Sequence, residues 1–311
     1  MGICNVRGYL SLIRSHQIVR NFFPSIFGMT SSLPGVDFGR FPYRRKSTEA
    51  GIVKGVIFDM GGVMTPQPVA VWHAMEQRLG LQQDSILATL FEPEIWKDFI
   101  RLEIGEITAP EFEDIYSRLY WDKNGLENSS AAFLPIFTEY SNSVPTRPEM
   151  VDAVQCLQAE GLKVALLTNN FFLDRQRSRR AIIPESGVFD YVIESCLAQM
   201  RKPDADIYNL TLETMRLGPS ETVFLDDIGA NVKAAAALGM KTIMVKSTET
   251  ALDELEQIVG FPVRGYEPMT IAVRKGMEIP VDNLVMYMTS LIGAPNGRVS
   301  VRQYVHGQSN P

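Results

Sequence analysis

The sequence predicts an α/β fold: a Rossmann-like parallel sheet with helices on both faces and an all-helical insertion after the first strand. Three observations support this prediction. Short β-branched apolar runs recur along the chain, helical patterns separate them, and one gap between successive runs is long enough for a helical unit of its own. Strands that alternate with helices form parallel βαβ units. The length of 311 residues also exceeds that of one average domain.

The expected strands are continuous apolar runs, which are typical of strands buried on both faces. They lie at 51–59, 163–169, 190–195, 222–227 and 241–245. Three helices expected between the strands each close with a glycine that suits a left-handed C-cap. These helices lie at 148–161, 204–218 and 230–240.

The gap at residues 67–147 is too long for a plain crossover and carries its own helical patterns, at 69–81, 84–103, 109–121 and 131–143. Thr108 and Glu111 form a capping-box pattern at the start of the third. Because the insertion follows the first strand, it lies near the carboxyl ends of the strands, where open α/β sheets bind ligands. We therefore expect it to act as a lid over the site.

The first 48 residues differ in charge from the rest of the chain. Residues 1–48 carry seven Lys or Arg and one acid, a net charge of +6, whereas the remaining residues carry −12. Arg7, Arg14 and Arg20 recur at roughly helical spacing among apolar residues and serines, which resembles a mitochondrial transit peptide. A disordered basic tail on a cytoplasmic or peroxisomal protein is the alternative. The acidic remainder argues against nucleic-acid binding.

Residues 261–311 differ from the α/β pattern that precedes them. The stretch 261–280 is punctuated by Pro and Gly and is expected to be a linker, 281–293 is expected to be a short helix, and one alternating strand follows. A lone strand cannot form a domain. No run of ~18 apolar residues occurs, so no membrane span is expected. Three widely separated cysteines argue for a reducing compartment.

Polar residues follow the expected strands at their carboxyl ends: Asp59, Thr168, Lys202, Asp226 and Asp227. Any one acid at a strand end can be only a turn or helix cap. Together, however, these residues meet at one edge of the sheet. Neighbouring carboxylates repel one another unless a cation neutralises them, and Mg²⁺ takes a few carboxylates together with substrate phosphate.

The same set of residues indicates phosphoryl chemistry. Lys202 supplies a positive charge for phosphate oxygens, and Thr168 with the Asn169 backbone supplies hydrogen-bond donors. Asp59 is then a candidate nucleophile, since a carboxylate can form an aspartyl-phosphate. Gly61 follows it closely and lets the backbone turn tightly near the metal or phosphate.

Four motifs, DMGGVMT, LLTNN, RKPDADIY and FLDDIGAN, resemble in order and spacing those of the haloacid dehalogenase (HAD) superfamily, over about residues 52–260. The resemblance implies that the helical insertion is a C1-type cap. Within the superfamily, the chain is most similar to the N-terminal HAD domain of mitochondrial multidomain proteins of the acyl-CoA dehydrogenase family. It also resembles, less strongly, the phosphatase domain of bifunctional soluble epoxide hydrolases. HGQSNP at the end of the chain resembles the start of the kinase-like domain of the former.

The resemblance to the acyl-CoA dehydrogenase family proteins implies that a full-length form carries kinase and acyl-CoA dehydrogenase domains in the same chain. This chain would then be a fragment or a short isoform of it. The resemblance also implies a link to fatty-acyl metabolism and a small phosphorylated or acyl metabolite as the ligand. The family implies that Asp59 is the nucleophile and a metal ligand, and that the Gly61 carbonyl, Asp227 and Asp226 complete a Mg²⁺ site. It further implies that Thr168, Asn169 and Lys202 bind phosphate, with Lys202 also stabilising the nucleophile.

One residue departs from the family pattern. HAD phosphatases carry a second Asp two residues after the nucleophile, as general acid and base, and this chain has Gly61 there. Losing such a group lowers the rate by about 10²–10⁴. We therefore expect a weak phosphohydrolase, or alternatively a catalytically silent phosphate-binding scaffold domain. The Asp226–Asp227 pair favours metal chemistry over dehalogenation.

Overall fold

The computed structural model describes residues 53–124, 144–182, 187–266, 270–273, 280–292 and 301–304. The expected leader (1–48) and the fourth expected helix of the insertion (131–143) lie outside the described residues. The chain divides into two compact units, one formed by Glu49–Ala272 with Tyr304–Pro311 and the other by Met1–Thr48 with Val273–Gln303. Among the described residues, no helix has the length and apolar character that crossing a membrane requires.

The five strands expected from the sequence form one parallel sheet with the order β3-β2-β1-β4-β5. The central strands are buried, as their continuous apolar runs predict. Because β1 lies between β2 and β4, the residue that follows β1 emerges between the ends of two neighbouring strands. The strands are β1 (Gly55–Phe58), β2 (Lys163–Thr168), β3 (Tyr191–Glu194), β4 (Thr222–Asp226) and β5 (Lys241–Met244).

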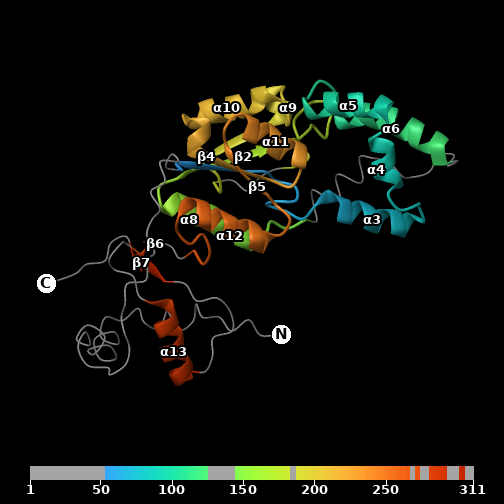
Figure 1. The fold of residues 1–311 in the computed structure, drawn as a ribbon. Helices are drawn as coiled ribbons and strands as arrows, with labels where there is room; N and C mark the ends of the chain where they lie inside the picture. The colour runs from blue at the N-terminus through green and yellow to red at the C-terminus, as the bar shows by residue number, and fades with distance from the viewer. Residues whose placement is uncertain are drawn as a thin grey trace, which may run out of the picture. The chain divides into compact units, whose positions relative to one another are not determined.

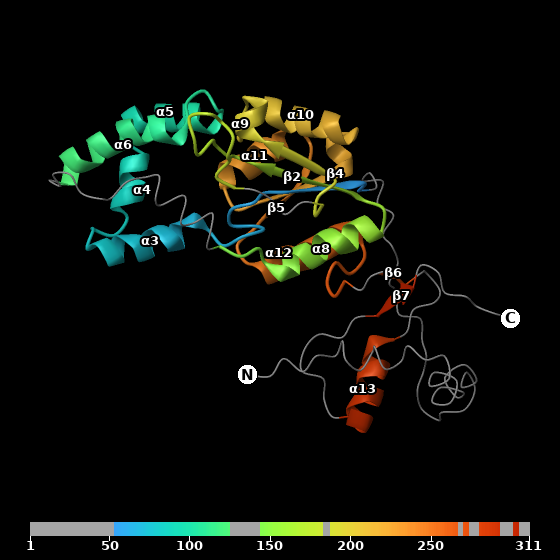
Figure 2. The ribbon, with the colours of Figure 1, turned by 180° about the vertical axis from the view of Figure 1, so that it is seen from behind.

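Helices cover both faces of the sheet (Figures 1 and 2). One face packs against α8 (Pro148–Ala159) and α12 (Thr248–Val259). The other face packs against α10 (Ala205–Met215) and α11 (Gly229–Ala237), and the short α9 (Ser195–Ala198) follows β3 directly. A 3₁₀ turn, η1 (Pro219–Glu221), leads into β4. The Rossmann-like α/β fold predicted from the sequence is thereby confirmed.

The predicted glycine C-caps hold for only part of these helices. Gly161 and Gly239 follow α8 and α11 with positive φ, as expected. Helix α10 instead ends at Arg216, which itself takes the left-handed conformation with φ 53°, while Gly218 has φ −82°. The prediction for α10 was therefore wrong, because the chain turns two residues before the glycine that was expected to close the helix.

Four described helices form the insertion after β1, hereafter the cap: α3 (Pro68–Leu79), α4 (Ser85–Leu90), α5 (Pro93–Glu103) and α6 (Ala109–Asn124). The single helix expected at 84–103 is two helices. Glu92 between them is extended, with φ −61° and ψ 135°, because the residue before a proline disfavours the helical conformation, and Pro93 starts α5. At the start of α6, Glu111 accepts from both the Thr108 backbone N–H and its hydroxyl, at 2.7 Å each.

The core also contributes to the interior of the cap. After β2 the chain forms a hairpin in which Phe172 pairs with Arg180 in an antiparallel bridge. Phe171, Leu173 and Ala181 from this hairpin join the hydrophobic cluster of the cap helices. In addition, the Ala109 N–H donates to the Phe172 carbonyl at 2.8 Å. Cap and core therefore share buried apolar surface beside the site.

The stretch expected to be a linker contains a short strand, β6 (Thr270–Ala272). The helix expected at 281–293 is present as α13 (Val281–Ile292), and the strand expected near the end of the chain is β7 (Arg302–Tyr304).

Candidate active site

A buried lysine lies between two carboxylates at the carboxyl edge of the sheet. Asp59 follows β1, and its backbone N–H donates to the Leu225 carbonyl of β4 at 2.9 Å. This hydrogen bond fixes the backbone of Asp59 beside the end of β4. Asp226 ends β4. Lys202, from the loop after α9, places its Nζ 2.6 Å from Asp59 Oδ1 and 2.8 Å from Asp226 Oδ2. Only 1% of Lys202 is exposed, so the ammonium is held inside the protein.

Burial and charge act in opposite directions on these groups. Burial raises the pKa of Asp59, and the nearby Lys202 opposes that rise without cancelling it. For Lys202, burial lowers the pKa, but Asp226 and Asp59 together outweigh it and raise the pKa above its usual value. Lys202 therefore stays charged, and two carboxylates share one buried ammonium. This excess of buried negative charge favours a further cation.

The adjacent aspartates at the end of β4 differ in their surroundings. Asp226 is fully buried, and in addition to Lys202 it accepts from the Ile228 N–H at 2.7 Å and from Asn231 Nδ2 at 3.0 and 3.1 Å. Asp227 is half-buried and accepts from the Gln67 side chain at 2.7 Å. Burial raises the pKa of Asp227. Protein donors thus engage Asp226 more fully than Asp227.

A glycine makes room for the Asp227 carboxylate. Gly62 has φ +78°, and a Cβ built on it would lie 2.1 Å from Asp227 Oδ2. An L-residue at this position would be strained and would overlap the carboxylate. The neighbouring Gly61 pairs with Thr65 in a parallel bridge within the same turn. Unlike Gly62, Gly61 does not have a positive φ. The loop after β1 therefore carries one strictly required glycine, Gly62.

The carboxylates fit a divalent metal ion. Asp59, Asp226 and Asp227 each offer an oxygen, and the three oxygens lie within 4.8 Å of one another. Such hard oxygen donors are the ligands that Mg²⁺ prefers. Since Asp226 already serves Lys202, Asn231 and a backbone N–H, Asp59 and Asp227 are the carboxylates whose oxygens are better placed to accept a cation.

Thr168 and Asn169 lie next to this cluster, at the end of β2. Thr168 is buried, and its hydroxyl donates weakly to the Asn169 carbonyl at 3.4 Å. The Asn169 side chain is turned to the Lys202 backbone, where Oδ1 accepts from the Lys202 N–H at 2.9 Å and Nδ2 donates to the Lys202 carbonyl at 3.0 Å. The side chain of Asn169 thus fixes the Lys202 peptide.

The cap supplies a residue that the sequence did not indicate. Glu103, the last residue of α5, is buried, and its Oε2 lies 2.6 Å from Arg201 Nε and 3.4 Å from Asn169 Nδ2. The Arg201 guanidinium lies over the Trp96 ring, 5.6 Å from its centroid. Burial raises the pKa of Glu103, and Arg201 opposes that rise. Arg201 stands in one of the quoted motifs beside Lys202, whereas no motif marks Glu103.

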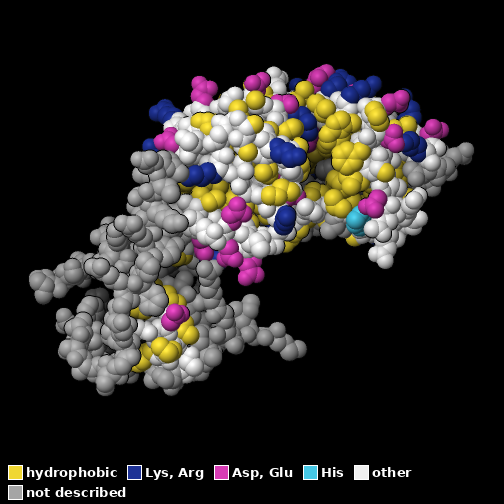
Figure 3. Space-filling model, in the orientation of Figure 1, with side chains coloured by type: hydrophobic (Ala, Val, Ile, Leu, Met, Phe, Trp, Pro, Cys, Tyr) yellow, Lys and Arg dark blue, Asp and Glu magenta, His cyan; other side chains and the backbone are white. Residues whose placement is uncertain are grey.

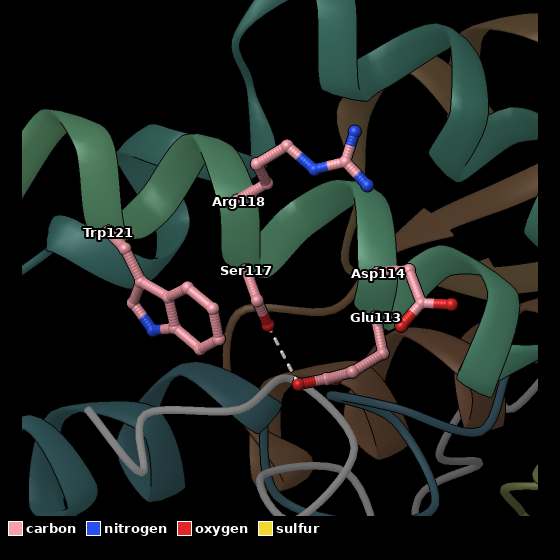
Figure 4. Close-up of a pocket in the computed structure, with 5 residues that line it drawn as sticks. All are labelled: Glu113, Asp114, Ser117, Arg118 and Trp121. Atoms are coloured by element: carbon pink, nitrogen blue, oxygen red, sulfur yellow. Dashed lines mark hydrogen bonds between the residues drawn. The ribbon is translucent and has the colours of Figure 1, made fainter. Parts of the chain in front are cut away.

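The surface of the cap has two further features, a hydrophobic area beside the core and a pocket along α6. On the face in Figure 3, hydrophobic side chains gather over the cap next to the core, with charged side chains around them. A pocket of about 420 Å³ runs along α6, and Ser117 at its wall donates to Glu113 at 2.8 Å (Figure 4). None of the site residues predicted from the sequence lines this pocket, which is formed by Glu113, Asp114, Ser117, Arg118 and Trp121.

The family model for haloacid dehalogenase-like hydrolases matches residues 53–239, the stretch that holds strands β1 to β4, the described cap helices and all of these carboxylates. The chain belongs to this family. The resemblance inferred from the four motifs is confirmed. Individual proteins are also similar to this chain in sequence.

Acyl-CoA dehydrogenase family member 10 of Mus musculus is 38% identical over 262 residues, covering 83% of this chain and 24% of the relative. Bifunctional epoxide hydrolase 2 of Sus scrofa is 34% identical over 218 residues, covering 67% of this chain and 39% of the relative. A sesquiterpene phosphatase of Aspergillus oryzae is 31% identical over 208 residues, covering 67% of this chain and 97% of the relative. The chain thus spans about a quarter of the first relative and about two fifths of the second.

A solved structure described as a dehalogenase shares the fold, with a TM-score of 0.51 and 16% identity, over 66% of this chain and 96% of that one. At this identity the likeness concerns the fold alone. The chain is therefore a HAD-family hydrolase domain whose sequence relatives include a phosphatase.

Proposed function

We propose that this HAD-like domain is a Mg²⁺-dependent phosphohydrolase that acts through an aspartyl-phosphate at Asp59. The observation that carries the proposal is the buried Asp59–Lys202–Asp226 arrangement, with Asp227 close enough to share a cation. The proposed metal ligands are Asp59, the Gly61 carbonyl, Asp227 and Asp226, and the proposed phosphate ligands are Thr168, Asn169 and Lys202. Bound Mg²⁺ would neutralise phosphate oxygens and orient them for in-line attack.

The residues of the chain divide the chemistry between them. The Asp59 carboxylate attacks phosphorus, which forms the acyl phosphate and breaks the bond to the leaving oxygen. Water then attacks the phosphorus, releases inorganic phosphate and restores the carboxylate. Lys202 holds Asp59 in place and balances charge on the phosphoryl group. Asn169 fixes the Lys202 peptide and offers a phosphate its backbone rather than its side chain.

Gly61 sets the level of activity. It occupies the position where a general acid would protonate the leaving oxygen, and it has no side chain to do so. Removing such a group costs about 10²–10⁴ in rate. Acyl and aryl phosphates have leaving groups that need little protonation, so we propose that they are hydrolysed better than alkyl phosphates.

The relatives supply the wider context of the proposal. We propose that the domain works in cis with kinase and acyl-CoA dehydrogenase domains on a small phosphorylated or acyl metabolite, in the mitochondrion, with residues 1–48 as a transit peptide. Fusing residues 1–48 to a fluorescent protein tests this location. Fluorescence that stays in the cytosol would contradict it.

The second candidate function is a catalytically silent scaffold domain that binds phosphate. The missing side chain at Gly61 favours it, because the remaining residues can bind an anion without turning it over.

An activity panel separates the two candidates. Phosphate release from acetyl phosphate and from para-nitrophenyl phosphate is measured with Mg²⁺ for the wild type, Asp59→Asn and Gly61→Asp. We expect Asp59→Asn to abolish the release, because the amide is not a nucleophile. We expect Gly61→Asp to raise the rate, most on para-nitrophenyl phosphate and by up to about 10²-fold. The φ at Gly61 permits a side chain, so this variant is expected to fold.

Asp206→Asn, an exposed aspartate on α10, is the matched control and is expected to leave the rates unchanged. Chelation of Mg²⁺ should stop release by the wild type. Equal rates for the wild type and Asp59→Asn on both substrates would reject the enzyme and favour the scaffold.

A further inference from the structure

Cap and core meet through a buried contact at the end of α5. Glu103 touches the core with both its side chain and its backbone. Its carboxylate accepts from Arg201 Nε at 2.6 Å, and its carbonyl accepts from the Ser195 hydroxyl at 2.6 Å. The contact is close because Gly105, with φ +71°, lets the backbone after α5 approach α9. A Cβ at Gly105 would lie 2.5 Å from the Cys196 carbonyl oxygen.

The ion pair within this contact is shielded from water. The side chains of Glu103 and Arg201 are each 11% exposed. The Arg201 guanidinium also lies over Trp96 of α5, so two cap residues hold it. Removing one partner of a buried pair leaves the other charge unpaired, which is strongly unfavourable. The contact therefore resists small displacements of the cap relative to the core.

The same contact is connected to Lys202 through Arg201 and through Asn169. Arg201 precedes Lys202 in the chain, and the Asn169 side chain bonds both the N–H and the carbonyl of Lys202. Asn169 Nδ2 also points to Glu103 Oε2, at 3.4 Å. The Glu103 carboxylate thus holds the residue before Lys202 and contacts the amide that clamps the Lys202 peptide.

We infer that Glu103 is a positioning residue, through which docking of the cap sets the place of the Lys202 ammonium. The inference rests on the function proposed above, since it assigns Glu103 to the same phosphate site. Without the carboxylate, Arg201 would turn toward water and Asn169 Nδ2 would lose one acceptor. The Lys202 peptide would then be held less firmly, and its ammonium would meet a phosphate less well. Asp59 and Asp227 would still be in place to take the metal.

Calorimetry on the full chain tests the inference, with Mg²⁺ alone and then inorganic phosphate in the presence of Mg²⁺ as the probes. We expect Glu103→Ala to weaken phosphate binding by about tenfold, which is the usual scale of coupling between sites. Glu103→Gln loses the charge but keeps an oxygen acceptor for Arg201 and Asn169, so it should weaken phosphate binding less than Glu103→Ala does. Mg²⁺ binding should not weaken in either variant, because a displaced Lys202 ammonium leaves more negative charge beside the metal ligands, whereas general damage to the fold would weaken it.

Glu106→Ala is the matched control, because the exposed Glu106 side chain pairs with Arg101 of α5, and only its backbone carbonyl, which the substitution keeps, accepts from Arg177 of the core. It should leave phosphate binding unchanged. Phosphate binding by folded Glu103→Ala that equals the wild type would overturn the inference. So would an equal loss in Glu103→Ala and Glu103→Gln, since the acceptor oxygen would then not be what matters.

Hydrogen exchange provides an arm that does not depend on phosphate binding. The Lys202 N–H, which donates to Asn169, should exchange at least tenfold faster in Glu103→Ala than in Glu106→Ala. If the wild type binds no phosphate, the proposed function fails, and this arm alone decides the positioning role. Faster exchange would support that role, and unchanged exchange would refute it.

Discussion

The two sides of the candidate site are built differently. On the Lys202 side, the ammonium, Asp226 and Asn231 are buried, and Asp226 bonds to both of the others. The half-buried Asn169 amide holds the Lys202 backbone. On the Asp227 side, the carboxylate is half-buried, Gln67 is its exposed partner, and the loop beside it carries glycines. The first side is a fixed electrostatic frame, whereas the second is open to a cation and a substrate. The frame should therefore govern the stability of the domain, and the open side should govern ligand binding.

Removing the centre of the frame is expected to have the largest effect. Lys202→Met leaves Asp59 and Asp226 buried without their cation, and breaking a buried pair in this way costs about 3–5 kcal/mol of unfolding free energy. Urea unfolding without Mg²⁺ measures the loss. Adding Mg²⁺ should restore stability more in this variant than in the wild type, because binding to the folded state stabilises it.

Lys233→Met, at an exposed position of α11, is the control and should change the free energy of unfolding by less than about 0.5 kcal/mol. Equal stability of Lys202→Met and the control would show that the frame does not hold the fold together.

A smaller effect is expected when the frame loses one amide. Asn231→Ala removes two hydrogen bonds to the Asp226 carboxylate, and hydrogen bonds to charged groups contribute about 1.5–3 kcal/mol each. Because one amide group makes both bonds, we expect a loss near the value for a single bond. Unfolding of Asn231→Ala is compared with that of Asn209→Ala, an exposed asparagine on α10. A loss no larger than in Asn209→Ala would mean that Asp226 does not depend on its amide partner.

The fold and the carboxylates could be predicted from the sequence, since each rests on a local pattern. Continuous apolar runs mark strands buried on both faces, and the parallel order then brings Asp59 and Asp226 to one edge. Side-chain partners from distant segments leave no such pattern. Glu103 is one acid in an amphipathic helix, and nothing local indicates that it meets Arg201, 98 positions later. The break at Pro93 was visible in the sequence, but the helical periodicity on both sides masked it.

The smallest effect is expected on the open side, from Gln67. Its side-chain amide donates to Asp227 as that of Asn231 donates to Asp226. Gln67→Ala removes the amide that bonds Asp227, but both groups keep contact with water, so the free energy of unfolding should change by less than about 0.5 kcal/mol. Mg²⁺ affinity, measured by calorimetry, should be equal or up to a few-fold higher, because the carboxylate no longer has to give up this hydrogen bond. A loss of stability as large as that of Asn231→Ala would show that Asp227 is as firmly held as Asp226. The distinction between a fixed and an open side would then be wrong, and Asp227 would be a structural residue rather than the carboxylate best placed to accept a metal ion.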